Sequence, residues 1–298
     1  MCTEALDLHI NNSRVEIQSG ETYSPVYGFD NLQLNDCYIA QPVGGYWFTD
    51  GDPETNNDGV YNADGTPFAG TLVIGQGEEP VIEYDVWVGG VRVTSANKHN
   101  ITGPGISGSV VYDDDENTLT LTDVTLESVG SNTIGIDYYG EEEPLTIRFN
   151  GNNTIGTANA PFRDGIYCVG VDLTVTGGSN QDTMNINATL EGIDNSLDID
   201  LGGWVNTWLG NGSFHINSPT PFRAYYSGGR NLVFSNMSAV CTGVTGEPMA
   251  GYEDVVLQDC HISQPSGGYF ADGRSPSQLM PFLMLSPGAP IWLSVPLK

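Results

Sequence analysis

The chain has 298 residues, of which 39% are hydrophobic and only 15% are charged, so it can bury a core and is not a disordered polymer. Its 37 acidic residues against 9 basic ones give a formal net charge of −28, which disfavours nucleic acid and anionic membrane surfaces as partners and leaves cations and neutral sugars. No apolar run of about 18 residues predicts membrane insertion, and the five widely spaced cysteines predict neither a disulfide framework nor a zinc site.

The first predicted strand begins almost at once, because Leu6, Leu8 and Ile10 alternate with polar residues and no signal peptide precedes them. The segment LNDCYIAQPVGGY at 34–46 recurs as LQDCHISQPSGGY at 257–269, with nine of thirteen positions identical. The chain therefore holds two copies of one module. We expect 1–75 to be the C-terminal end of a first module with a closing hairpin, 76–80 a linker, and 81–298 a second module with an atypical C-terminal tail.

An acidic segment within the first module alternates oxygen donors with other residues. Such donors suit Ca²⁺, although the spacing does not fit an EF-hand and a proline interrupts the loop. The alternative is a plain acidic loop, so the expected cofactor is none, with Ca²⁺ as the one candidate. The predicted metal ligands are Asp50, Asp52, Glu54 and Asp58.

Short alternating strands recur through the second module, with steps of 24 to 35 residues between their first residues. The apolar spacing of two, the abundance of Thr, Val and Ile, and the Asn- and Gly-rich turns favour strands over helical repeats. The chain is therefore predicted to be all-β, as a right-handed parallel β-helix (β-solenoid) with about three short strands per coil of roughly 24–28 residues. These strands are predicted to begin at Leu119, Leu145, Leu173, Leu197, Leu232 and Val256.

The longest step, from Leu197 to Leu232, contains the segment 202–208, which we expect to be an inserted loop on a binding face. Exposed aromatic rings pack on sugar C–H groups, and one member of each Tyr-Tyr pair, 138–139 and 225–226, is expected to point outward. The alternative is that these aromatics seal the coils internally. The predicted ligand-binding residues are Trp204, Trp208, Tyr138 and Tyr225.

No catalytic residue is assigned. Asp198 and Asp200 would both face outward from one strand, but outward polar residues are also what an exposed strand needs. Arg163 and Arg223 end matching Pro-Phe-Arg triplets, which predict a repeated structural turn.

Three segments carry a resemblance: YDVWVGGVRVTSANKHNI from 84, VVYDDDENTLTLTDVTL from 110 and DCHISQPSGGYF from 259. They resemble β-helical repeat modules of bacterial, gut-type surface or secreted proteins, which are often labelled as carbohydrate-binding. The resemblance implies an extracellular or cell-surface location, glycan binding or adhesion, a polysaccharide or glycan as partner, and membership of a larger multi-module surface protein. A structural spacer within such a protein and a polysaccharide lyase or hydrolase are the alternative functions.

Overall fold

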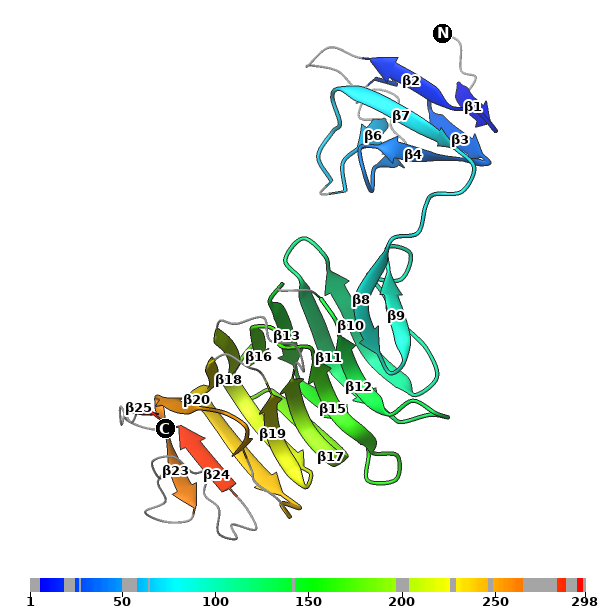
Figure 1. Ribbon diagram of the computed structural model, residues 1–298. Helices are drawn as coiled ribbons and strands as arrows, with labels where there is room; N and C mark the ends of the chain where they lie inside the picture. Colours follow the sequence, from blue (N-terminus) through cyan, green and yellow to red (C-terminus); the bar gives the residue numbers. More distant parts are fainter. Residues whose placement is uncertain are drawn as a thin grey trace. The chain divides into compact units, whose positions relative to one another are not determined.

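The structure is a computed structural model that describes residues 6–18, 25–26, 28–49, 58–63, 65–140, 143–196, 204–225, 229–245, 249–264, 283–287 and 294–296. Every regular element in these ranges is a β-strand, which confirms the predicted all-β class (Figure 1). The chain divides into two compact units, Met1–Val81 and Ile82–Lys298. In the described part of the chain there is also no helix with the length and apolar character of a membrane span.

Unit 1 is a small stack of strands around an apolar core. β1 and β3 pair in parallel, with Leu8 opposite Leu32, while β7 runs antiparallel between β2 and β4. Its strands are β1 (Asp7–Asn11), β2 (Val15–Gln18), β3 (Asn31–Asn35), β4 (Cys37–Gln41), β5 (Tyr46–Phe48), β6 (Gly59–Tyr61) and β7 (Thr71–Gln76). The buried residues of its core are Ile10, Val26, Leu32, Val60, Leu72 and Ile74.

Unit 2 is the larger stack and holds the remaining strands. They are β8 (Glu83–Val88), β9 (Val91–Thr94), β10 (Ile106–Asp113), β11 (Thr118–Leu126), β12 (Ile134–Tyr138), β13 (Leu145–Asn150), β14 (Asn152–Ile155), β15 (Phe162–Cys168), β16 (Leu173–Gly177), β17 (Thr183–Ser196), β18 (Trp204–Asn217), β19 (Thr220–Tyr225), β20 (Gly229–Thr242), β21 (Met249–Ala250), β22 (Asp254–Gln258), β23 (Cys260–Gln264), β24 (Leu283–Pro287) and β25 (Ser294–Pro296).

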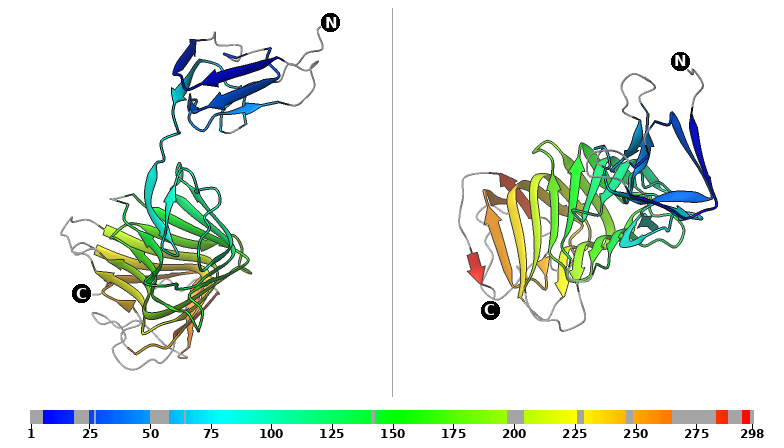
Figure 2. Two further views of the ribbon diagram at one scale, coloured as in Figure 1. Left: turned by 90° about the vertical axis from the view of Figure 1, so that its right-hand side faces the viewer. Right: turned by 90° about the horizontal axis from the view of Figure 1, so that it is seen from above.

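These strands wind into stacked coils with three walls, which confirms the predicted β-solenoid (Figure 2). The first wall is the parallel series from β11 through β13, β16, β18 and β20 to β22. The second wall is the series from the end of β11 through β14 to the later parts of β18 and β20. The third wall runs from β12 through β15, the end of β17 and β19 to β21. The long strands β17, β18 and β20 each turn a corner and serve two walls.

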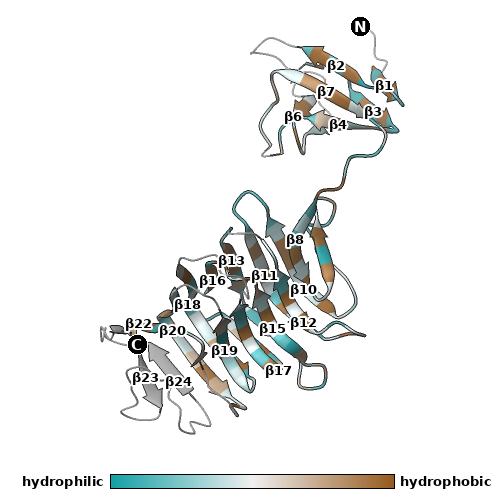
Figure 3. Ribbon diagram, viewed as in Figure 1, coloured by the Kyte–Doolittle hydropathy of each residue, from teal (hydrophilic) through white to brown (hydrophobic). Residues whose placement is uncertain are grey.

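Inward side chains form continuous ladders through the stack, because side chains alternate between the faces of a strand. Figure 3 shows the resulting alternation of hydrophobic and hydrophilic bands along the strands. Burying one such aliphatic side chain completely stabilises the fold by about 1.5–3 kcal/mol. The third wall contributes the buried ladder Ile136, Ile166, Ile193, Phe222 and Met249.

The corners between the first and second walls use residues that tolerate left-handed backbone angles. Asn211 and Asn236 have φ values of 41° and 46°, and the Nδ2 of Asn236 donates to the Oδ1 of Asn211 at 3.0 Å. Asp123 and Asp259 adopt the same left-handed region. Asn and Asp enter this region at lower cost than other non-glycine residues. The expected role of Asn at sharp turns is thus met at Asn211 and Asn236, whose stacked amides are joined by a hydrogen bond.

Antiparallel strands cover both ends of the coil stack. At the first coil, β8 pairs with β12 and β10 pairs with β11. At the last coils, β24 pairs with β20 and β23, and β25 pairs with β22. Unpaired edges of parallel strands would otherwise recruit further chains.

The prediction of an inserted loop at 202–208 is wrong from Trp204 onward, where the strand β18 begins. Leu173 pairs with Thr207 rather than with Leu197, so β18 continues the first wall. Both segments alternate apolar and polar residues, and the sequence alone does not choose between them. The core accepts the later one, in which Val205, Thr207 and Leu209 are buried. Residues 197–203, including Asp198 and Asp200, lie outside the described residues.

Candidate functional site

The four predicted ligand-binding aromatics lie on two different walls. Trp204 and Trp208 belong to β18 in the first wall, whereas Tyr138 and Tyr225 belong to β12 and β19 in the third. The side chains of Trp204 and Tyr225 lie outside what the structure describes. The structure therefore does not bring the four together into one site.

Tyr138 does not offer a face to a ligand, because it is only 2% exposed. Its hydroxyl accepts from the Nδ2 of Asn117 at 2.5 Å and donates to the carbonyl of Glu143 at 3.1 Å. The neighbouring Tyr139 is 45% exposed. The prediction of an outward tyrosine in this pair therefore holds for Tyr139 and is wrong for Tyr138.

Trp208 is half-buried on the outer face of the first wall, in register with Thr174 and Val233. Its indole covers Gly210 so closely that a Cβ on that glycine would lie 2.3 Å from the ring. An aromatic ring that covers a strand glycine stabilises the sheet. This contact supports the packing alternative for Trp208.

No cation site is assigned to the predicted acidic loop. Asp50, Asp52 and Glu54 lie outside the described residues, and Asp58 is half-buried. Among the side chains that the structure describes, no three His, Cys, Asp or Glu residues converge as metal ligands.

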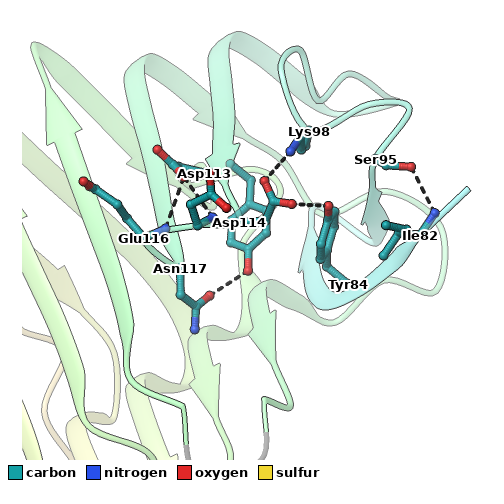
Figure 4. A network of polar contacts seen from close by, with 10 residues as sticks. Ile82, Tyr84, Ser95, Lys98, Asp113, Asp114, Glu116 and Asn117 are labelled. Atoms are coloured by element: carbon teal, nitrogen blue, oxygen red, sulfur yellow. Dashed lines mark hydrogen bonds and ion pairs between the residues drawn. The ribbon is translucent and has the colours of Figure 1, made fainter. Parts of the chain in front are cut away.

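The acidic turn after β10 fastens the first end of the stack (Figure 4). Asp114 accepts a hydrogen bond from the Tyr84 hydroxyl at 2.5 Å and pairs with the ammonium group of Lys98. Burial raises the pKa of Asp114, but the hydrogen bonds from Lys98 and Tyr84 outweigh burial and leave that pKa below its ordinary value. Since Tyr84 is on β8 and Lys98 follows β9, this carboxylate ties the covering hairpin to the first coil.

A second polar cluster lies on the outer face of the third wall. No sequence pattern indicated that these side chains come together. Five side chains occupy one register row across five strands, one from each. Neighbouring strands are about 4.8 Å apart, so the row is continuous. Its members are Trp87, Asp137, Tyr167, Asp194 and Arg223.

Aromatic rings gather at one end of this row. Tyr139, which follows β12, lies edge-on to Trp87 with ring centroids 5.6 Å apart, and its ring is 5.9 Å from that of Tyr167. The guanidinium of Arg92 lies 4.9 Å from the Trp87 ring centroid. We call Trp87, Tyr139 and Tyr167 the aromatic cluster; it joins side chains from three neighbouring strands or their ends.

Carboxyl and guanidinium groups continue the face beside the aromatic cluster. Arg163 donates to Asp164 Oδ2 at 2.6 Å through Nη2 and at 2.9 Å through Nε. Arg223 donates to Glu191 Oε1 at 2.6 Å. The acid side chains are only 1% and 3% exposed, while the arginines are 53% and 47% exposed. Together with Asp137 and Asp194 we call these residues the acidic cluster.

Burial disfavours the charged form of these acids. It raises the pKa of Glu191 to about 7, and a hydrogen bond with Asp164 acts in the same direction against the pull of Arg223. Burial and the negative charge of Asp164 raise the pKa of Asp137 to about 6. Burial also raises the pKa of Asp194. Oδ1 of Asp164 and Oδ1 of Asp137 are buried without a hydrogen-bond donor.

One part of this cluster had a signal in the sequence. The Pro-Phe-Arg triplets mark Arg163 and Arg223, but they predict only a structural turn. Each arginine in fact pairs with a buried acid, and Arg223 reaches one from the preceding coil. Glu191 could not be found in this way, because its neighbours depend on the register between coils.

Comparison with known proteins adds no relative: no family model matches the chain, and no similar characterised protein or solved structure was found.

The third wall presents side chains of the kinds that contact polyhydroxylated ligands. Aromatic faces pack on pyranose C–H groups, carboxylates accept from hydroxyls, and the half-exposed guanidinium groups donate. Hydrolysis of a glycoside needs two carboxyl groups separated by about 5 Å or more. Asp164 and Glu191 instead face each other directly in the register of β15 and β17, and their side chains are only 1% and 3% exposed, so they are not placed to flank a bond of a ligand on the outer face.

Proposed function

We propose that unit 2 binds a glycan on the outer face of its third wall. The single observation that carries the proposal is the aromatic cluster, in which Tyr139 contacts both Trp87 and Tyr167 beside carboxyl and guanidinium groups. Tyr139 is the most exposed of the three rings and would stack on a sugar. Arg163 and Arg223 would donate to hydroxyl or ring oxygens.

The repeating geometry of the wall supports an extended chain as the ligand. Side chains of one register row recur at the coil spacing of about 4.8 Å, so a repeating polymer can meet similar groups at successive steps. The resemblance noted above supports the same ligand class and supports an extracellular or cell-surface location. The net charge of −28 favours neutral over anionic polysaccharides.

Affinity electrophoresis of the full chain through gels containing a panel of neutral and charged polysaccharides tests this proposal. We expect retardation by at least one polysaccharide. Tyr139→Ala should lose about tenfold or more in affinity, since removing an aromatic ring that stacks on a ligand costs about 1–3 kcal/mol of binding free energy. Tyr46→Ala is the matched control, because Tyr46 is 41% exposed but belongs to unit 1.

The same experiment distinguishes the alternatives. If unit 2 is a structural spacer, no polysaccharide in the panel retards the chain, and that result would contradict the proposal of glycan binding. If Tyr139→Ala is retarded as strongly as the wild type, the binding site does not lie at the aromatic cluster of the third wall. Release of reducing ends or unsaturated products during the binding experiment would indicate a hydrolase or lyase instead.

A further inference from the structure

The Asp164–Glu191 pair lies below the proposed glycan face and has a property that does not depend on a ligand. We infer that Glu191 retains a proton in the folded chain and donates it to Asp164 across the step from β15 to β17, and that this proton makes the coil stack of unit 2 sensitive to pH. Release of the proton places a second negative charge inside the wall and weakens the stack.

The geometry of the pair leaves one buried carboxyl oxygen without a hydrogen-bond donor. Asp164 and Glu191 are partners in the register of the two parallel strands, and their side chains are 1% and 3% exposed. Arg163 takes one oxygen of the aspartate, and Arg223 takes one oxygen of the glutamate. Oδ1 of Asp164 remains buried without a donor. A protonated Glu191 is the neighbouring group that can supply that donor.

The groups around the pair set its charge balance. Asp137 faces it from β12, Asp194 from β17 itself, Arg163 from β15 and Arg223 from β19. Among these described groups the full cluster has four carboxyl groups and two guanidinium groups. Ionising the last carboxyl therefore adds charge that no cation of the cluster offsets, which is costly at a buried position.

The direction of the pH effect follows from the shift. The raised pKa of Glu191, about 7, lies above the value of about 4.3 for an unfolded glutamate, so the folded state binds the proton more tightly. The stabilising contribution is complete below the unfolded pKa, falls as pH rises above it, and is lost above about 7. The raised pKa of Asp137, about 6, acts in the same direction.

Thermal unfolding of the full chain between pH 4.5 and 8.5 tests the inference through Glu191→Gln. The glutamine amide can donate to Asp164 permanently, and its carbonyl can still accept from Arg223. We expect the Tm of the wild type to fall across the neutral range and that of Glu191→Gln to fall distinctly less. Glu253→Gln is the matched control, because Glu253 pairs with Arg230 at 2.9 Å outside the cluster and should leave the pH slope unchanged.

A direct measurement keeps the inference testable if that variant does not fold. In the wild type, ¹³C NMR of the side-chain carboxyl groups should show Glu191 titrating with a midpoint near 7. Asp164→Asn removes the neighbouring negative charge that favours the protonated form of Glu191, so this midpoint should move down. Titration of every Asp and Glu carboxyl below about pH 5 in the wild type would overturn the inference, as would an unchanged pH slope in a folded Glu191→Gln. Neither readout involves a polysaccharide, so failure here is distinct from failure of the glycan proposal.

Discussion

At the scale of single residues, two adjacent side chains at the end of β12 have opposite roles. Tyr138 is buried and hydrogen-bonded, while Tyr139 is exposed within the aromatic cluster. We expect Tyr138→Ala to destabilise unit 2 by about 3–5 kcal/mol, as for other buried aromatic residues, without a specific effect on polysaccharide binding by the folded protein. Tyr139→Ala should change the free energy of unfolding by about 0.5 kcal/mol or less and should weaken only polysaccharide binding. Urea unfolding of the two variants checks this contrast, and equal losses of stability would contradict it.

The corner residue Asn236 gives a second prediction at this scale. Its φ of 46° costs a residue with a Cβ about 1–2 kcal/mol unless the side chain compensates, and here the amide bonds to Asn211. We expect Asn236→Ala to lose about that amount of stability and Asn236→Gly to lose less, because glycine adopts this angle freely. Denaturant midpoints of the two variants give the comparison. Equal losses in the two variants would contradict this and would show that the amide hydrogen bond, not the backbone angle, fixes the corner.

At the scale of elements, the β8–β9 hairpin depends on the Asp114 carboxylate. Its lowered pKa means that the folded state favours the ionised form, so its contribution is present above the unfolded value of about 3.9 and is lost as pH falls below it. We expect lower protection factors against hydrogen exchange in β8 and β9 below about pH 4. Asp114→Asn should show the lowered protection already at pH 6, and Asp113→Asn should not, since Asp113 accepts bonds within its own turn. Equal exchange in the two variants would contradict this role.

How much of this arrangement the sequence predicts also depends on the element. The strands expected from Leu119, Leu145, Leu173, Leu232 and Val256 all form. The step after β16 in the first wall is made by β18, with Thr207 opposite Leu173, because two alternating segments compete and packing between coils decides between them; the strand expected from Leu197 lies outside the described residues. Glu191 meets Asp164 only through that register, which depends on how many residues each turn contains. Polar contacts between coils, such as Asp164 with Glu191, could therefore not be predicted from the sequence, whereas the apolar ladder could be predicted from the alternation of residues.

At the scale of the whole molecule, acid groups act on stability in opposite directions. The raised pKa values of Glu191 and Asp137 favour the fold at mildly acidic pH, and the lowered pKa values of Asp114 and Asp182 favour it above about pH 4. The net charge of −28 adds general repulsion as the remaining acids ionise. We expect maximal stability near pH 5 and a higher Tm at pH 8 when NaCl is raised from about 0.01 to 0.15 M, since salt screens exposed charges. A Tm that rises steadily from pH 5 to pH 8 would contradict this balance.

The solenoid gives the third wall a regular parallel register, and the proposed function depends on that wall. Hydrogen–deuterium exchange of the full chain, with and without a polysaccharide that retards it, tests this most directly. We predict slower exchange in 134–139, 162–168 and 191–196 on binding, and no change around Trp208 in 204–210. Protection confined to 204–210, or to unit 1, would contradict the assignment of the glycan site to the third wall.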